Sequence, residues 1–314
     1  MLKFAMKEKS MLGRFFIVLF FVVQVQVYGQ QDPLFTQYYN NYSLINPAYA
    51  GSHGFFTATA YLCGPWVAKS GGPESMSLSI HGATEKNFGI GFSVVHNNEY
   101  MLNETRAFLD FSYSMDVSKY STLALGIKSG GRILKVDYEK IGISKEDLFQ
   151  ENVNEFKQNL GIGAFYYSDN HYASLSIIDL FRIPFYDQSL KTIQKINRMK
   201  FYLSAGYIHE INDDLKMKPS FMIKTLNDRI VSTDISTNIL WKDQIEFGLS
   251  YRLDKAVSGL LQVALSDCVK LSYSINTVSK RLNGYSGPSQ DIKLSFDLNT
   301  YGKHSYSEKA PFYW

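Results

Sequence analysis

The stretch "QIEFGLSYRL" (residues 244–253) alternates apolar and polar side chains from end to end. Its apolar members are Ile245, Phe247, Leu249, Tyr251 and Leu253. Successive side chains of a β-strand point to opposite faces, so this stretch predicts a strand with one apolar and one polar face. The same period of two recurs in "VKLSYSIN" (269–276), in "DIKLSFDL" (291–298) and from Val231 to Trp241. Helical periodicity of similar strength is absent from the sequence, which therefore predicts an all-β fold.

Alternating segments follow one another along most of the chain. Most run nine to thirteen residues, which exceeds the roughly five to six residues of a soluble strand and approaches the roughly nine to eleven of a tilted membrane-crossing strand. Their number is about fourteen, which is even. The expected strands are residues 53–62, 75–83, 87–96, 105–115, 120–130, 157–168, 171–179, 199–209, 214–225, 229–241, 243–253, 256–266, 268–278 and 289–299.

The connections between these segments provide an independent criterion. If the first strand rises from the periplasm, the even-numbered connections of an outer-membrane barrel are short periplasmic turns. In this sequence they are short and polar, at residues 84–87, 116–119, 168–170, 211–214, 242–243 and 266–267. Long connections occur only among the odd-numbered ones, at residues 62–74, 131–156, 180–198 and 279–289, although those near Asn227 and Asp254 are short.

A soluble sandwich of two sheets is the alternative, because it also alternates an apolar inner face with a polar outer face. Strand length, the 15% aromatic content and the rhythm of the connections favour a transmembrane, antiparallel, up-and-down β-barrel of about 14 strands. Its polar face would line the lumen with charges of both signs that can pair, without a single-sign ring suited to selecting an ion. These charges are Asp110, Lys128, Lys216, Lys218, Lys224, Asp234, Glu246, Arg252, Lys270, Asp291, Lys293 and Asp297.

The N-terminus predicts export. Basic residues precede the apolar run "FFIVLFFVV" (15–23), and a small residue, Gly29, follows it, which is typical of a secretory signal peptide over residues 1–29. The alternative is a membrane anchor, but nine apolar residues cover less than half of the roughly 30 Å hydrocarbon core. The formal net charge of +3 equals the surplus carried by residues 1–29. The mature chain is then near neutral and lacks the basic patch of a nucleic-acid binder.

Catalytic signals are weak. The six histidines are scattered singly, without metal-ligand spacing or a nucleophile elbow, so we expect no enzyme, no metal and no cofactor. His81 is the best candidate for a base, and we interpret it as a lumen-facing or rim histidine. "GIG" occurs at 89–91 and at 161–163 inside expected strands, where glycine relieves crowding at the inner wall of a barrel. Cys63 and Cys268 are expected at opposite ends of the barrel.

The stretch "QDPLFTQYYNNYSLINPAYAGS" (31–52) has neither strand nor helix periodicity. It resembles the mature N-terminus of the PorP/SprF family, outer-membrane proteins of Bacteroidota linked to type IX secretion and gliding motility. The family's QDPxFTQY-like segment corresponds to residues 31–38, and its NPAYAG motif to residues 46–51. The resemblance continues in "GPWVAKSGGPESMSLSIHG" (64–82) and "GLSYRLDKAVSGLLQ" (248–262), while "CGP" before the Trp and the ending "APFYW" depart from the family pattern.

The resemblance implies an outer-membrane accessory protein of a Gram-negative bacterium, with a periplasmic N-terminus. Its implied partners are outer-membrane lipid, a secreted surface protein such as an adhesin with a type IX C-terminal signal, and periplasmic motor-linked or secretion components, but no nucleic acid. Two other functions stay open: a passive porin or hydrophobic-solute channel, and a soluble adhesin built as a sandwich. The expected organisation is a signal peptide (1–29), a periplasmic or plug segment (30–52), the barrel (53–299) and a tail (300–314).

The segment after the signal peptide has a composition that suits a plug. Asn, Gln, Tyr and Pro satisfy an irregular backbone through side-chain and turn hydrogen bonds, so the segment could fill the lumen or dock partners at the periplasmic mouth. The alternative is that Pro33 and Pro47 only shape a capped entry into the first strand. The candidate plug or docking residues are Asp32, Phe35, Gln37, Asn46, Pro47 and Tyr49.

Overall fold

The chain divides into two compact units, Met1–Leu34 and Phe35–Trp314, and every described residue belongs to the second. The expected signal peptide and C-terminal tail lie outside the described residues, as do Asp32, Phe35 and Gln37. The computed structural model describes residues 41–64, 74–84, 87–99, 102–136, 153–181, 183–187, 192–196, 199–226, 229–253, 256–278 and 288–298.

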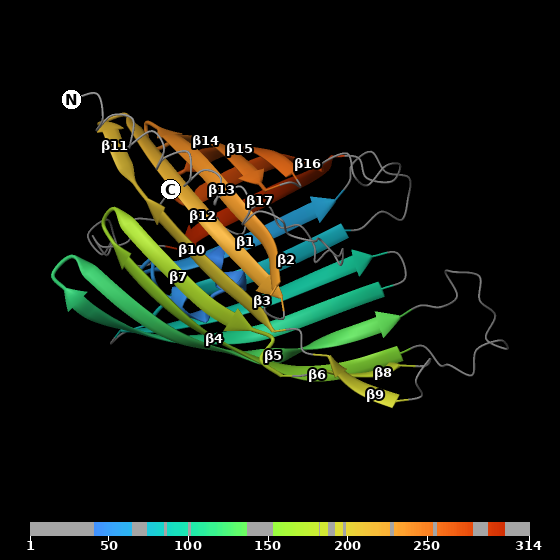
Figure 1. The fold of residues 1–314 in the computed structure, drawn as a ribbon. Helices are drawn as coiled ribbons and strands as arrows, with labels where there is room; N and C mark the ends of the chain where they lie inside the picture. The colour runs from blue at the N-terminus through green and yellow to red at the C-terminus, as the bar shows by residue number, and fades with distance from the viewer. Residues whose placement is uncertain are drawn as a thin grey trace, which may run out of the picture. The chain divides into compact units, whose positions relative to one another are not determined.

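Antiparallel strands make up nearly all of the described chain, and consecutive strands lie side by side (Figure 1). Among the described residues, no helix has the length and apolar character needed to cross a bilayer. The strands are β1 (Phe56–Gly64), β2 (Glu74–Ala83), β3 (Phe88–Glu99), β4 (Leu102–Ser118), β5 (Ser121–Val136), β6 (Val153–Ser168), β7 (His171–Ile178), β8 (Ile183–Asp187), β9 (Thr192–Ile196), β10 (Lys200–Tyr207), β11 (His209–Asn212), β12 (Leu215–Leu226), β13 (Arg229–Trp241), β14 (Ile245–Arg252), β15 (Ala256–Ser266), β16 (Val269–Val278) and β17 (Ser289–Leu298).

The main sheet closes on itself. β1 pairs with β2 on one side and with β17 on the other, so the first and last strands meet. β10 and β11 both pair with β12 and are separated only at Ile208, so they act as one strand of the wall. The sheet is therefore a closed barrel of 14 antiparallel strands, which confirms the predicted fold class.

Each expected segment corresponds to one strand of this wall. The largest differences lie at the ends that carry the long connections, where β5 continues to Val136 and β6 begins at Val153. A second difference is the hairpin β8–β9, which falls inside the expected loop 180–198, and within the described residues its two strands pair with each other. Its strands are too short for a membrane crossing, so the length criterion assigned them to a loop.

The burial pattern is the reverse of that in a soluble sandwich. Leu249 and Phe111 are 69% and 56% exposed, whereas Lys128 and Asp291 are 1% and 0% exposed. A soluble protein buries its apolar side chains and leaves charged ones in water. In this barrel the polar face of each strand points inward and the apolar face points outward, as in a wall surrounded by lipid. The alternation in the sequence therefore reflects an apolar outer surface of the barrel.

Short turns join the strands at one end of the barrel. The turn from β13 to β14 places Lys242 and Asp243 at φ values of 54° and 53°, and the Gln244 N–H donates to the Trp241 carbonyl over 3.1 Å. Two positive φ values in a two-residue turn match the right-handed twist of the paired strands. Cys268 lies at this end, in the turn from β15 to β16, whereas Cys63 lies near the opposite end of β1, and both thiols are free.

The outward apolar face yields the first prediction. Replacing Leu249, at the centre of β14, with arginine should destabilise the lipid-embedded barrel by about 2–4 kcal/mol, because the side chain faces hydrocarbon. Urea unfolding in lipid vesicles, followed by tryptophan fluorescence, measures this loss. Ile211→Arg is the matched control, because Ile211 is exposed beside a turn and arginine there should cost about 0–1 kcal/mol. Equal losses at the two sites would contradict a lipid-facing Leu249.

Candidate functional site: the lumen segment

Residues 41–55, here called the lumen segment, form two short turns before β1. They contain the 3-10 helices η2 (Tyr42–Leu44) and η3 (Pro47–Tyr49). Asn46 caps η3, because its Oδ1 accepts a hydrogen bond from the Ala48 N–H over 2.9 Å. Pro47 follows at the first helical position, where its fixed φ suits a helix and its missing N–H costs nothing. The "NPA" sequence thus fixes the local turn.

Asn46 also fastens the segment to the barrel wall. Its Nδ2 donates to the Ser174 hydroxyl on β7 over 2.8 Å and to the Ala164 carbonyl on β6 over 3.0 Å. The side chain is fully buried, so each of these bonds replaces one that water would otherwise make. A single asparagine therefore shapes η3 and attaches it to two strands.

An aromatic cluster holds the other face of the segment. Tyr42 donates its hydroxyl hydrogen to the Tyr172 hydroxyl over 2.9 Å, and its ring lies 5.4 Å from that of Tyr49. Phe165 of β6 packs edge-on against Tyr49, with ring centroids 5.3 Å apart. Burial raises the pKa of both Tyr42 and Tyr49, so both remain neutral. These rings belong to a buried apolar cluster inside the barrel, and Tyr61, Cys63 and Val95 form a second one.

Glycines in the wall let the segment approach at backbone distance. A Cβ built on Gly126 of β5 would lie 2.4 Å from the Ala48 nitrogen, and one on Gly163 of β6 would lie 2.0 Å from Asn46 Oδ1. A Cβ on Gly89 of β3 would lie 2.1 Å from the Ala50 carbonyl oxygen. At these three points, on β3, β5 and β6, the inner wall has no side chain where the lumen segment touches it. The expected relief of crowding in the "GIG" repeats is found at Gly89 and Gly163.

Polar side chains of the wall bind the segment's carbonyl groups. Lys128 of β5 donates to the Ser43 carbonyl over 3.1 Å and pairs with Asp110 of β4, with Nζ and Oδ1 2.8 Å apart. Ser112 of β4 donates to the Ala50 carbonyl over 2.5 Å. A buried charge is costly unless it is paired, so the Lys128–Asp110 pair is stable only with both members present.

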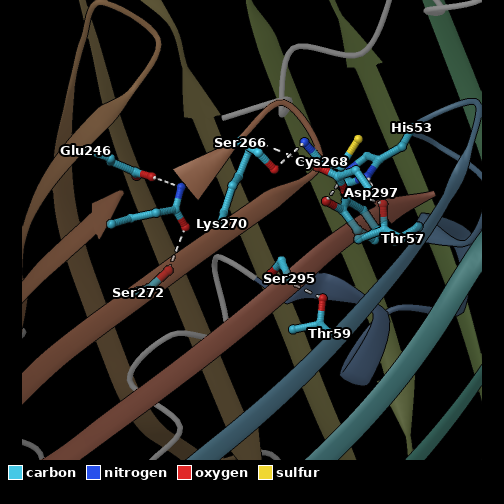
Figure 2. Close-up of polar contacts among 12 residues, drawn as sticks. His53, Thr57, Thr59, Glu246, Ser266, Cys268, Lys270, Ser272, Ser295 and Asp297 are labelled. Atoms are coloured by element: carbon cyan, nitrogen blue, oxygen red, sulfur yellow. Dashed lines mark hydrogen bonds and ion pairs between the residues drawn. The ribbon is translucent and has the colours of Figure 1, made fainter. Parts of the chain in front are cut away.

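A chain of polar contacts connects the segment to the seam between the first and last strands (Figure 2). The Tyr49 hydroxyl lies 2.7 Å from His53 Nε2, and His53 Nδ1 lies 3.1 Å from the Thr57 hydroxyl. Thr57 in turn donates to Asp297 Oδ1 on β17 over 3.0 Å. Burial, and then the Lys270 charge, lower the pKa of His53 to about 3. His53 is therefore a neutral link between the segment and the barrel.

The candidate residues inside the described chain all belong to this assembly. Asn46, Pro47 and Tyr49 are buried between the segment and the inner wall. His81 packs against Tyr49 and His53, with ring centroids 5.2 Å from each, which gives it a packing contact. Sequence reasoning missed Tyr42 and His53. Tyr42 lies close to the NPAYAG motif. The contacts of Tyr42 and His53 with strands distant in the sequence, however, depend on the register in which the barrel strands pair.

The rest of the lumen carries paired charges. Arg252 Nε and Asp234 Oδ1 lie 2.6 Å apart on β14 and β13, and a second hydrogen bond joins Arg252 Nη2 to Asp234 Oδ2 over 3.1 Å. Glu246 accepts from Gln262 over 2.8 Å and from Asn238, and Ser272 donates to Gln262 Oε1 over 2.7 Å (Figure 2). No group of three or more His, Cys, Asp or Glu suited to a metal ion occurs in the described part of the chain.

The family comparison matches most of the chain. A family model described as type IX secretion system membrane protein PorP/SprF matches residues 27–296. No curated protein matches. Similar solved structures include a Pseudomonas aeruginosa FadL homologue, with 11% identity, 80% of this chain and 92% of that chain covered, and a TM-score of 0.49. Omp33 of Acinetobacter baumannii has 8% identity, 79% and 100% coverage, and a TM-score of 0.46.

The Pseudomonas putida toluene transporter TodX shows a similar likeness, with 11% identity, coverage of 83% of this chain and 95% of that chain, and a TM-score of 0.43. These solved structures are outer-membrane proteins or transporters of other kinds, and at such low identity they say nothing about the function of this chain.

Wall glycines yield the second prediction. Gly126→Ala combined with Gly163→Ala should loosen the lumen segment, because both new Cβ atoms meet it well inside contact distance. Hydrogen exchange measured by mass spectrometry should show faster exchange in residues 41–52 and unchanged exchange in the barrel strands. Gly259→Ala is the control, since a Cβ there meets nothing within 4 Å. Unchanged exchange in the double variant would mean that the segment does not press against the wall.

His53 yields the third prediction. The folded protein keeps His53 neutral down to about pH 3, whereas the unfolded chain protonates it below its ordinary pKa of 6.5. Stability should therefore fall as the pH drops from about 6.5 toward 3, because the unfolded state binds the extra proton. His53→Gln should reduce the difference in urea midpoint between about pH 7.5 and pH 5. His209→Gln, at an exposed site, should leave it unchanged, and an identical pH response in His53→Gln would exclude this role.

Proposed function

The chain belongs to the PorP/SprF family of type IX secretion system membrane proteins, and from this premise we propose that it is a closed accessory barrel that helps to secrete or anchor surface proteins. Its place is the outer membrane, in keeping with the family and the lipid-type barrel wall. The proposed role is non-enzymatic. Its proposed partners are a secreted surface protein, such as an adhesin with a type IX C-terminal signal, and periplasmic motor-linked or secretion components.

The observation that carries this proposal is the attachment of the lumen segment. Asn46, Lys128 and Ser112 make side-chain hydrogen bonds that join the segment to four strands, β4 to β7. A passive channel needs an aqueous path, and wide water-filled barrels are of the porin type. A segment held by bonds on several strands and by an aromatic core favours a closed barrel that works through its partners.

We further propose that the N-terminus is periplasmic and that residues 31–40 extend the lumen segment toward partners there. The short turns and the start of β1 occur at one end of the barrel, and short turns are periplasmic in outer-membrane barrels. Asp32, Phe35 and Gln37 would then belong to the docking part of the segment, and Asn46, Pro47 and Tyr49 to the part that closes the lumen.

The fourth prediction concerns the native complex. Gentle purification of the protein from its native outer membrane, without overexpression, should recover a large secreted surface protein or periplasmic components, identified by mass spectrometry. The same preparation should not conduct in planar bilayers. The Gly126→Ala, Gly163→Ala variant should conduct, because it frees the segment that closes the lumen, while Gly259→Ala should stay closed.

Deletion of residues 31–46 provides the matching test of partner docking. We expect the deleted protein to lose recovered partners, while heat modifiability on gels reports whether the barrel itself still folds. Recovery of the wild-type barrel alone, folded and conducting, would overturn the accessory role in favour of a passive porin or solute channel. Unchanged folding, secretion and partner recovery after the deletion would separate the segment from the function.

A further inference from the structure

A row of four polar side chains connects the lumen segment to the strand pair that closes the barrel. Tyr49, His53 and Thr57 follow one another at every fourth position of the sequence, and Asp297 of β17 ends the row. Figure 2 shows the last three of these side chains pointing toward one another. We call the row the seam relay. The direction in which its hydrogen bonds run follows from the chemistry of the groups at its two ends.

The Asp297 end of the seam relay can only accept. Asp297 is directly opposite Thr57 in the β1–β17 pair, and Lys270 Nζ lies 3.7 Å from its Oδ2. A carboxylate has no hydrogen to donate, and a threonine hydroxyl has one. Thr57 donates that hydrogen to Asp297 Oδ1 over 3.0 Å. The Thr57 oxygen, 3.1 Å from His53 Nδ1, must therefore accept from the imidazole.

The Tyr49 end of the seam relay agrees with this direction. His53 is neutral, as its lowered pKa indicates, and a neutral imidazole has a hydrogen on only one nitrogen. With that hydrogen on Nδ1, Nε2 accepts from the Tyr49 hydroxyl over 2.7 Å. The opposite direction would take the Thr57 hydrogen away from Asp297. It would also leave the Tyr49 hydroxyl hydrogen without an acceptor among the described residues.

We propose that Asp297 is a positioning residue that sets the direction of the seam relay, places the imidazole hydrogen on His53 Nδ1 and thereby holds the Tyr49 hydroxyl. The hydrogen bond made by one ring nitrogen of a histidine decides the role of the other. Asp297 is opposite Thr57 only when β17 pairs with β1. Closure of the wall is thus a condition for seating the lumen segment. This inference rests on the proposed function, because it names what keeps the segment in its closing position.

The surrounding residues hold the rings of the seam relay in place. The His81 ring on β2 lies 5.2 Å from the rings of both Tyr49 and His53. Gly51 and Gly54 enclose His53 in a turn with φ values of 82° and 76°, which glycine adopts at little cost. The Tyr49 ring has little freedom to find another partner, so the state of its hydroxyl depends on His53.

The first test is the position of the imidazole hydrogen in the wild-type protein. Full-length protein labelled with ¹⁵N-histidine is placed in lipid nanodiscs near neutral pH, and NMR distinguishes protonated from unprotonated ring nitrogens. The His53 signals are those that disappear in His53→Gln. We expect a hydrogen on Nδ1 and none on Nε2. A hydrogen on Nε2 would overturn the proposal, and this readout needs no variant of the relay to fold.

Thr57→Val tests the relay with little change in side-chain shape. It removes the hydroxyl that joins His53 to Asp297, so part of the population should move the hydrogen to Nε2. Loss of this bond should also speed hydrogen exchange in residues 41–54 roughly three- to tenfold. Thr57→Ser restores the hydroxyl and should restore both results. Thr59→Val is the matched control, because Thr59 is equally buried on β1 and its hydroxyl lies 3.5 Å from that of Ser295.

Asp297→Ala tests the positioning role itself. It frees the Thr57 hydrogen to point at His53, so it should shift the tautomer as Thr57→Val does. Lys270→Gln, which removes the cation beside Asp297, should keep the hydrogen on Nδ1. Heat modifiability on gels identifies the variants that fold. An unchanged tautomer in folded Thr57→Val or Asp297→Ala, or an equal change in Thr59→Val, would overturn the proposal.

Conductance of the wild-type protein in planar bilayers separates this inference from the proposed function. A closed wild-type barrel with the hydrogen on Nε2 would reject the seam relay alone. A conducting wild-type barrel with the hydrogen on Nδ1 would reject the closed barrel and support the direction of the relay.

Discussion

The rest of the structure depends on the requirement that every backbone hydrogen bond in hydrocarbon be satisfied within the protein. Lipid offers no donors or acceptors, so strands cross a membrane only in a closed barrel. The pairing of β1 with β17 over residues Phe56–Gly64 meets this requirement where the first and last strands of the barrel lie side by side. Closure then fixes which side chains face lipid and which face the lumen, and the polar interior follows from it.

Burying polar and charged side chains inside the barrel costs free energy, and two features of this barrel offset that cost. Charges are paired, as in Lys128 with Asp110, because an unpaired buried charge is far more expensive than a paired one. The lumen segment supplies further partners, because its Ser43 carbonyl accepts from Lys128 and its Ala50 carbonyl from Ser112.

The fold was largely predictable from the sequence, because membrane strands impose a period of two and a characteristic length on every segment. "QIEFGLSYRL" forms β14 with Glu246 inside and Leu249 outside, as its alternation indicates. The candidate site was only partly predictable. Asn46 and Pro47 carry a local turn signal, but the contacts of Asn46 with Ser174 and of His53 with Thr57 depend on strand register and barrel closure.

The central claim is that residues 41–55 lie inside the barrel in the native membrane. The most direct measurement is a disulfide between cysteines replacing Asn41 and Ser79, whose side chains are 3.3 Å apart, in a protein whose native cysteines are serine. A protease site inserted in residues 65–73 lets a non-reducing gel report the bond in intact cells after cleavage. The account predicts that the two fragments stay joined until a reductant is added. Fragments that separate without reductant, in a barrel that is folded, would contradict it.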